Sequence, residues 1–255
     1  MLVDFFITGV QKGGTTALDF YLRSHPQVQM AAKKELHYFD DETIDWGNPD
    51  YSRLQSQFDW NVRNVKRGEA TPIYIYWPQS IARLHRHNPA AKIIVGLRHP
   101  SFRAFSHWRM EMERGLDTLP FDQAISPGGR QRVRLAPEGV HRIFSYVERG
   151  LYSQQIGRLL TIFPARQVHF FRTDKLWHDY ENVFRKAQQF LGLDERVYKD
   201  RRYIAPLDST HVGNLVPSLR AKLDHLFAPD IRQTASLTGM DLTDWLAPSY
   251  DEGIG

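Results

Sequence analysis

Apolar residues along the chain form short blocks separated by turn-forming residues. Two of these blocks, at residues 3–8 and 92–97, have the length and composition of buried strands, and the second (KIIVGL) contains a single charged position. Short runs without polar alternation are typical of parallel strands covered on both faces by helices. Further strands are expected at 28–30, just before Thr71, and at 167–171.

Between these blocks the apolar spacing changes to the three- and four-residue repeat of amphipathic helices. Helices are expected at about 15–24, 51–58, 79–86, from Pro100 onward, and at 140–163, 180–191, 218–227 and 230–237. Gly192 follows one of these patterns as a typical C-terminal cap. The alternation predicts an α/β fold of three layers, in which a central, mostly parallel sheet is flanked by helices.

Two stretches have no clear period. Residues 115–139 hold prolines and glycines among polar residues and are predicted to form a long mobile loop, and residues 200–216 are equally irregular. Neither stretch has the composition of a linker between domains. A single domain over 1–255 is therefore expected.

Composition narrows the class of protein. The hydrophobic fraction of 42% and the charged fraction of 24% are those of a globular protein, and the net charge of +4 suits an anionic ligand without naming one. Because there is no cysteine, disulfides and thiolate metal sites are excluded. The amino terminus lacks the pattern of a secretion signal and no apolar run reaches the roughly 20 residues of a membrane span, so a cytoplasmic location is expected.

The strand at 3–8, the turn at 9–14 and the helix that follows predict an anion site. Glycine lets backbone N–H groups approach one ligand, and the helix adds the positive end of its dipole. The turn reads GVQKGGTT, with Lys12 before the glycine pair. In the P-loop of nucleoside triphosphatases the lysine directly follows the last glycine, where this chain has Thr15. An ATP-dependent phosphotransferase and a turn without a ligand stay open as alternatives.

Five segments together resemble the sulfotransferases that use 3′-phosphoadenosine 5′-phosphosulfate (PAPS), in the branch that contains the heparan sulfate sulfotransferases. Residues 9–18 (GVQKGGTTAL) are similar to the family's 5′-phosphosulfate loop, and residues 33–40 (KKELHYFD) to its K-E-x-H-F-F-D segment. Residues 68–72, 97–106 and 239–245 resemble E-K-[ST]-P, R-x-P-x-x-R-A-x-S and the late G-x-x-x-x-x-W. The resemblance implies the sulfotransferase fold, with its P-loop-like strand, loop and helix.

The resemblance also implies which residues hold the nucleotide, without a metal. Lys12 would neutralise charge on the oxygen that bridges phosphate and departing sulfuryl group. The 5′-phosphate would be held by backbone and hydroxyl donors of Gly13, Gly14, Thr15 and Thr16. Arg98 and Ser106 would hold the 3′-phosphate of PAPS and of its product, 3′-phosphoadenosine 5′-phosphate (PAP). For Arg98 the alternative is a surface salt bridge.

On the acceptor side, the resemblance implies that Glu35 is the general base, which takes the hydroxyl proton as the new O–S bond forms. Its alternative is a solvated charge in a turn. His37 would share a face with Glu35 in an extended segment, where it would orient Glu35 or contact the acceptor, unless it is structural. Three aromatic residues are candidates for the lining of the acceptor cleft: Tyr74, Trp108 and Tyr152. The alternative is that they belong to the core, which is commoner for aromatic residues.

Two departures from the family pattern affect the acceptor. Ala70 replaces the lysine of E-K-[ST]-P, and residues 208–214 lack the lysine and arginine of the basic S-K-G-R loop that closes over the nucleotide in relatives. These losses favour a small-molecule, natural-product or short oligosaccharide acceptor over a polysaccharide.

The segment 126–139 contains three arginines, Arg130, Arg132 and Arg134. They would recruit an acidic or carrier-bound acceptor, or else belong to a solvated loop. No nucleic-acid or membrane partner is expected, and the sequence leaves the oligomeric state open. A non-catalytic protein that binds polyanions or nucleic acid is the remaining alternative.

Overall fold

The computed structural model describes residues 1–197 and 214–252, which fall into two compact units. One unit is formed by Met1–Leu97 and Arg158–Pro206, and the other by Arg98–Gly157 and Leu207–Gly255. Each unit thus combines two separate stretches of the chain. The expectation of a single domain over 1–255 stays a prediction.

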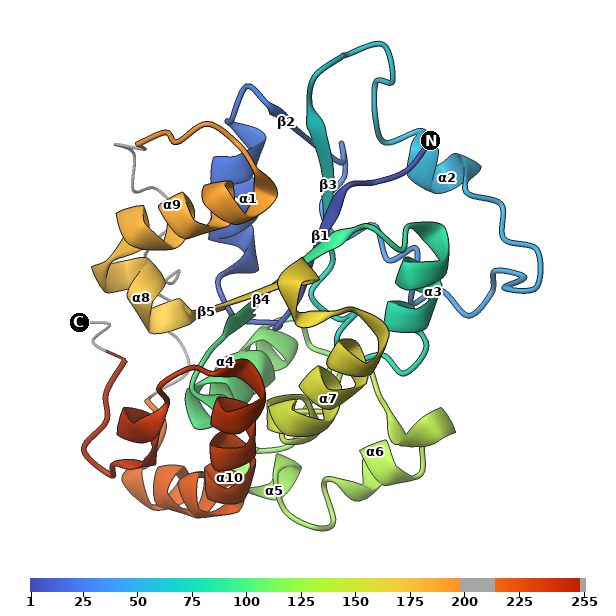
Figure 1. Ribbon diagram of the computed structural model, residues 1–255. Helices are drawn as coiled ribbons and strands as arrows, with labels where there is room; N and C mark the ends of the chain where they lie inside the picture. The colour runs from blue at the N-terminus through green and yellow to red at the C-terminus, as the bar shows by residue number, and fades with distance from the viewer. Residues whose placement is uncertain (198–213, 253–255) are drawn as a thin grey trace. The chain divides into compact units, whose positions relative to one another are not determined.

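The first unit contains a five-stranded sheet in the order β2-β3-β1-β4-β5 (Figure 1). The strands are β1 (Phe5–Gly9), β2 (Val28–Met30), β3 (Lys66–Ala70), β4 (Lys92–Leu97) and β5 (Val168–Arg172). All four neighbouring pairs are parallel, so the carboxyl ends of the strands share one edge. The predicted α/β fold is confirmed, with a sheet that is parallel throughout.

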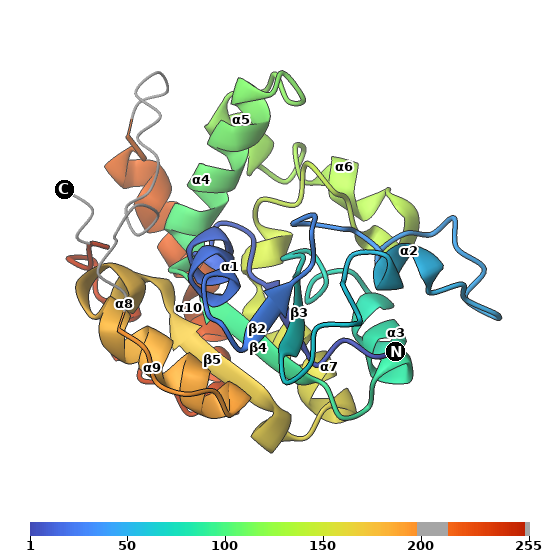
Figure 2. The same ribbon diagram turned by 90° about the horizontal axis from the view of Figure 1, so that it is seen from above.

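The two faces of the sheet are covered by different helices. Phe5 and Ile7 of β1 belong to one buried cluster with side chains of α1 (Thr15–Arg23), α8 (Thr173–His178) and α9 (Tyr180–Leu191). Phe6 points to the other face, where its ring lies 6.4 Å from that of His87 on α3 (Ser80–His87). Figures 1 and 2 both show α8 and α9 beside β5. The three predicted layers are therefore present in this unit.

Several element bounds agree with the sequence pattern. The strands at 28–30 and 92–97 and the helix at 180–191 have the predicted bounds. Gly192 ends that helix at φ 74°, in the left-handed conformation that a glycine cap provides. The helix predicted at 51–58 is shorter, since α2 covers only Ser52–Gln55.

The second unit is helical in its described residues. Its main elements are α4 (Pro100–Glu113) and α10 (Pro217–Thr238), which contact each other. Shorter pieces are α5 (Phe121–Ala124), α6 (Gln131–Arg134), η1 (Pro137–Gly139), η2 (Glu148–Gly150) and η4 (Thr243–Leu246). Helix α7 (Tyr152–Ile162) begins in this unit and ends in the first, where η3 (Ala165–Gln167) follows it.

The two helices predicted at 218–227 and 230–237 are one helix, α10, which continues through Pro229. A proline inside a helix removes one backbone hydrogen bond and favours a break. Here Leu223, Phe227 and Ile231 are buried at four-residue intervals on both sides of the proline. Packing of this continuous apolar face offsets the lost bond.

Two further predictions about the second unit are wrong. The helix expected at 140–163 begins only at Tyr152. Residues 115–139 contain α5, α6 and η1 instead of an open loop. The reason is a buried carboxylate, Asp117, which binds the Arg132 guanidinium through two hydrogen bonds of 2.9 and 3.0 Å and accepts a third from the Tyr146 hydroxyl.

Candidate active site

The turn between β1 and α1 is held against β4 by backbone contacts. The Val10 N–H donates to the Gly96 carbonyl at 2.9 Å, and the Gly13 N–H donates to the Val10 carbonyl at 2.9 Å. A methyl group at Gly13 would lie 2.6 Å from the Gly96 carbonyl oxygen and 2.8 Å from that of Val10. Because both neighbours are backbone atoms, only glycine fits at this point.

Helix α1 begins at this turn without a side-chain cap among the described residues. Gly14 precedes the helix at φ 79° and has no side chain to offer to the first-turn N–H groups. These N–H groups have no partner inside an α-helix, and they lie at the positive end of its dipole. Thr15 is buried and Thr16 is exposed at the same end. The cradle therefore fits a phosphate group held by backbone donors.

Lys12 lies in this turn, half-buried and in the left-handed backbone region at φ 68°. This conformation costs a residue with a side chain roughly 1–2 kcal/mol. The turn thus holds a lysine next to the cradle in a backbone conformation that an isolated chain would avoid.

The segment at 33–40 is not extended, which was the condition under which Glu35 and His37 would share a face. Glu35 and His37 both have left-handed backbones, at φ 59° and 53°. Their side chains nevertheless meet, because His37 Nε2 lies 3.8 Å from Glu35 Oε2. The expected proximity of the two side chains is present, through a tight turn instead of a shared strand face.

Two more charged groups extend this contact. Lys34 Nζ donates to Glu35 Oε1 at 2.7 Å, and His37 Nδ1 lies 2.9 Å from Oδ2 of the fully buried Asp40. Glu35 and His37 are 43% and 44% exposed in their side chains, so both are open to a substrate. The geometry gives an accessible carboxylate flanked by a lysine and by a histidine that a buried aspartate orients.

Helix α1 is tied to the chain just before this segment. Arg23 binds Asp19 one turn earlier in the same helix, with Nη2 and Oδ1 3.1 Å apart, and donates from Nη1 to the Ala31 carbonyl at 2.8 Å. Burial raises the pKa of Asp19, while the positive charges of Arg23 and Lys34 lower it. The helix of the phosphate cradle and the Glu35 segment thus share one charge network inside the first unit.

Glu69, at the end of β3, is a buried carboxyl group that the sequence reasoning did not single out. Burial raises the pKa of Glu69 to about 7, against the smaller opposing effects of hydrogen bonds from the Thr71 hydroxyl and the Leu36 N–H. The nearby Asp40 raises this pKa and His37 lowers it. Glu69 therefore contacts the Glu35 segment, through the hydrogen bond from the Leu36 N–H at 3.3 Å.

In the second unit, Arg98 is engaged by a carboxylate. Its Nε lies 2.9 and 3.0 Å from the two oxygens of Glu252, and its Nη2 lies 2.6 Å from Oε2. The two side chains are only 10% and 3% exposed. Arg98 therefore forms a salt bridge, as the alternative held, but the bridge is buried and does not lie on the surface. A phosphate at this guanidinium has to displace Glu252 or share Arg98 with it.

Two residues that precede Glu252, Trp245 and Tyr250, contact His99, which follows Arg98 in the chain. The Tyr250 ring stacks on the His99 imidazole at 5.0 Å, and His99 Nε2 lies 3.0 Å from the Trp245 carbonyl. Burial lowers the pKa of His99 to about 4, although Asp224 opposes the shift. The aromatic contact of a neutral imidazole thus holds the segment that carries Glu252.

Ser106 lies on α4, half-buried. Among the three arginines of 126–139, Arg130 pairs with Glu148 at 2.7 Å and Arg132 with Asp117, while Arg134 is exposed and donates to the Pro127 carbonyl. Two of the three charges are therefore already paired within the second unit.

The aromatic residues considered for the acceptor cleft belong to the core. Tyr74, Trp108 and Tyr152 are all buried, and the Tyr152 hydroxyl donates to the Arg98 carbonyl at 2.7 Å.

The structure brings the predicted residues together in two groups. Lys12, the cradle, Glu35 and His37 belong to the first unit, and Arg98 and Ser106 to the second. The question of a closing loop at 208–214 falls, except for its last residue, outside the described residues. The sequence could have indicated Asp40 as a site residue, because Asp40 ends the K-E-x-H-F-F-D segment. Glu252 had no such signal.

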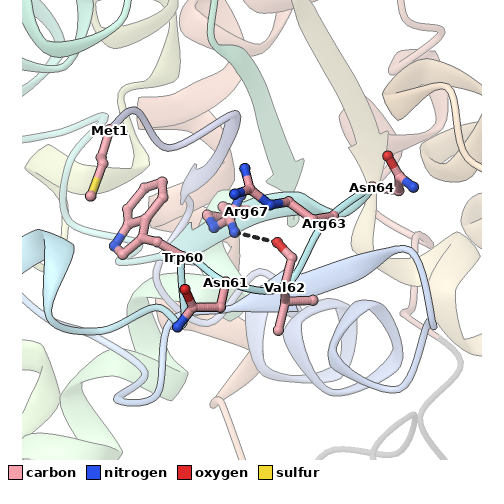
Figure 3. A pocket seen from close by; sticks show the side chains of 7 residues that line it. All are labelled: Met1, Trp60, Asn61, Val62, Arg63, Asn64 and Arg67. Atoms are coloured by element: carbon pink, nitrogen blue, oxygen red, sulfur yellow. Dashed lines mark hydrogen bonds between the residues drawn. The ribbon is translucent and has the colours of Figure 1, made fainter.

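A pocket of about 520 Å³ lies elsewhere in the first unit (Figure 3). It adjoins Arg67, near the amino end of β3, whereas the phosphate cradle follows the carboxyl end of the parallel β1. Arg67 stacks over Trp60 at 4.4 Å and donates to the Val62 carbonyl at 2.8 Å. The pocket contains none of the predicted site residues.

The described ranges contain neither a cluster of metal ligands nor a membrane-spanning helix. Within 1–197 and 214–252, no group of three or more His, Asp and Glu side chains is placed to hold a metal ion. No helix within these ranges combines the length and hydrophobicity of a membrane span.

Comparison with known proteins identifies the family. Residues 2–205 match the model of the sulfotransferase domain. The chain belongs to this family. It is 33% identical to heparan sulfate glucosamine 3-O-sulfotransferase 6 of Mus musculus over 197 residues, which cover 77% of this chain and 54% of that protein. The chain spans about half the length of the curated relatives it matches.

Solved sulfotransferase structures agree with the fold. The sulfotransferase from Alicyclobacillus acidocaldarius superposes with a TM-score of 0.83 at 29% identity, over 97% of this chain and all of that one. Mouse sulfotransferase SULT7A1, solved in complex with PAP, has a TM-score of 0.53 at 14% identity, over 92% of this chain and 86% of that one. The second likeness shows the fold alone.

Proposed function

We propose that this sulfotransferase-family chain transfers a sulfuryl group from PAPS to a hydroxyl group of a small-molecule, natural-product or oligosaccharide acceptor by in-line displacement. The observation that carries the proposal is the uncapped amino end of α1 behind Gly13 and Gly14, with Lys12 beside it and Glu35 in the same unit. Family membership supports the reaction class.

The nucleotide would be held at both phosphates. The donors of the cradle would bind the 5′-phosphate, through Gly13, Gly14, Thr15 and Thr16. Arg98 and Ser106 would bind the 3′-phosphate, as the resemblance implies. Membership of the sulfotransferase family supports this nucleotide.

PAPS supplies an activated sulfuryl group, and the residues of this chain would handle the charges and the proton. Glu35 takes the proton of the acceptor hydroxyl while the acceptor oxygen forms its bond to sulfur. The bond between sulfur and the bridging phosphate oxygen breaks, and its electron pair stays on that oxygen. The Lys12 ammonium neutralises the charge that develops there.

His37 would keep the base in place. Its Nδ1 faces Asp40 at 2.9 Å, so the buried carboxylate fixes the ring, and its Nε2 faces Glu35. Lys34 holds the other oxygen of Glu35 at 2.7 Å. The carboxylate is thereby restricted to few orientations before the acceptor arrives.

The acceptor is proposed to be smaller than the polysaccharides named for the curated relatives. Ala70 removes a lysine that the family places in E-K-[ST]-P, and with it a cation for a polyanionic chain. A panel of hydroxyl compounds that includes a heparan sulfate oligosaccharide, phenols and hydroxylated natural products tests this point. Faster transfer to the oligosaccharide than to all small hydroxyl compounds would reverse the proposal.

Calorimetric titration with PAP tests the donor. Binding of PAP that is much tighter than that of AMP, which lacks the 3′-phosphate, is the expected result. Turnover with PAPS should persist in EDTA, whereas an ATP-dependent phosphotransferase would need Mg²⁺. Equal affinity for PAP and AMP, or turnover that collapses in EDTA and returns with Mg²⁺, contradicts sulfuryl transfer from PAPS.

The base is tested by Glu35→Gln. This variant should bind PAP as the wild type does and lose about 10²- to 10⁴-fold in turnover, the range that a positioned base contributes. The matched variant Glu113→Gln, at an exposed glutamate that ends α4, serves as the control. Retained activity in Glu35→Gln would remove Glu35 from this role.

A further inference from the structure

Five consecutive backbone N–H groups of the Glu35 segment, at residues 35–39, are all accepted by the end of β3 and the turn after it. The Glu35 N–H donates to the Ala70 carbonyl at 3.0 Å. The other four donate to side chains: Leu36 to Glu69 Oε1 at 3.3 Å, His37 to Thr71 Oγ1 at 3.4 Å, and Tyr38 and Phe39 to the Tyr74 hydroxyl at 3.0 and 3.4 Å.

A regular parallel strand would take these N–H groups with backbone carbonyls spaced for an extended partner. Side-chain oxygens can be reached by a backbone that turns, and this segment turns at Glu35 and again at His37. Left-handed backbones at residues with side chains persist only where the surroundings determine them. The three side chains at 69, 71 and 74 are those surroundings.

We propose that Glu69, Thr71 and Tyr74 are positioning residues for sulfuryl transfer, which set the backbone that aims Glu35 and His37 at the acceptor. This inference rests on the proposed function. The three residues do not touch the reacting atoms themselves. They act through the segment 35–39, and the E-x-[ST]-P motif is thereby joined to the K-E-x-H-F-F-D motif by hydrogen bonds.

The burial of Glu69 supports this role. The residue is 0% exposed, and burying a carboxyl group is costly unless it is hydrogen-bonded. Its Oε1 accepts from both the Leu36 N–H and the Thr71 hydroxyl, the latter at 2.5 Å. Thr71 thus binds Glu69 with its proton and His37 with its lone pair, and the two contacts fix the hydroxyl in one orientation.

Thr71 offers a matched pair of variants for the test. Thr71→Val keeps the shape of the side chain and removes the hydroxyl, whereas Thr71→Ser keeps the hydroxyl. Turnover is measured with PAPS and the hydroxyl compound of the panel that reacts fastest, and affinity with PAP. Hydrogen exchange of the amides at 35–39 is measured on the same proteins without any acceptor.

Thr71→Val is expected to lower kcat about 10- to 100-fold. Its Kd for PAP and KM for PAPS should stay within about twofold of the wild type, and the His37 amide should exchange faster. Thr71→Ser should restore both kcat and exchange. Glu69→Leu, which removes the oxygen that accepts from the Leu36 N–H, should accelerate exchange at Leu36 and lower kcat in the same direction. A role limited to stability would lower the melting temperature in all variants without separating kcat from KM.

Wild-type kcat in Thr71→Val and Glu69→Leu, despite faster amide exchange, would overturn the proposal. So would a loss of kcat with unchanged exchange, because the residues would then act directly on the substrates. Should the wild type bind PAP but transfer no sulfuryl group, the proposed function fails. Exchange at 35–39 would then still decide whether Thr71 and Glu69 hold the segment.

Discussion

The phosphate cradle and the Arg98 pair are both proposed to meet a phosphate group of one nucleotide, yet their donors differ in origin. The cradle uses backbone N–H groups at the start of α1, directly after the short turn that follows β1. The second site uses one guanidinium, and its present partner Glu252 comes 154 positions later in the chain. A local backbone site is built before any ligand arrives, while a side-chain site already holding a carboxylate has to exchange partners.

The cradle should be the more sensitive of the two to a small change. Gly13→Ala places a methyl group 2.6 Å from a backbone oxygen, so the turn has to move and several N–H donors lose their aim together. We expect PAP to bind at least about 100-fold more weakly in calorimetry, since each bond to a charged group contributes roughly 1.5–3 kcal/mol. Gly157→Ala is the control, because a methyl group there meets no atom within 4 Å. An unchanged Kd in Gly13→Ala would show that the cradle does not bind the nucleotide.

The Arg98 site should lose less, and only for ligands with a 3′-phosphate. Removing Arg98 alone leaves Glu252 buried without its partner, so the double variant Arg98→Gln/Glu252→Gln keeps the site neutral. Its affinity for PAP should fall about 10- to 100-fold, as for one charge-assisted contact, with AMP affinity unchanged. Equal losses for PAP and AMP would place the 3′-phosphate elsewhere.

The contact of Glu69 with the Glu35 segment is intermediate in sequence separation, since Glu69 and Leu36 are 33 positions apart. Its pKa is raised from 4.5 to about 7, so the unfolded chain ionises before the folded one does. Stability should therefore fall as the pH rises from about 4.5 to 7 and then level off. Between pH 5 and pH 8 the free energy of unfolding, measured in urea, should fall on the order of 2 kcal/mol more in the wild type than in Glu69→Gln. Parallel pH curves for both proteins would contradict the raised pKa.

Glu252→Gln should have the smallest effect and the opposite sign. Without its charge the side chain competes less with a phosphate for Arg98. The Gln oxygen still accepts a neutral hydrogen bond from Arg98, which contributes about 1 kcal/mol less than one to a carboxylate, so PAP should bind about 3- to 10-fold more tightly. Asp251→Asn, at an exposed neighbour, is the matched control. Weaker binding of PAP in Glu252→Gln would mean that Glu252 presents Arg98 to the phosphate instead of competing with it.

Local features of this chain could be predicted from its sequence. The KIIVGL strand and the cap at Gly192 depend on the residues within each element, and their predicted positions are confirmed. The glycine turn was placed correctly between strand and helix for the same reason. What the turn binds, and the roles of Glu35 and His37, stay predictions.

Features set by distant partners could not be predicted. The backbone turns at 35–39 could not be predicted, because no pattern in these residues shows that oxygens of Glu69, Thr71 and Tyr74 accept their N–H groups. The irregular composition of 115–139 hid the pairing of Arg132 with Asp117. Arg98 was recognised, while its carboxylate partner was not, because ion pairs across such separations leave no pattern.

The close approach of Gly13 to β4 limits how relatives of this protein can vary. A methyl group at Gly96 would lie 2.6 Å from the Gly13 carbonyl oxygen, just as one at Gly13 would lie 2.6 Å from that of Gly96. Neither residue has a side chain that could shrink to make room for the other. A substitution at either position therefore has no compensating substitution at its partner, and we expect selection for suppressors of Gly13→Ala to recover revertants or changes that shift whole elements.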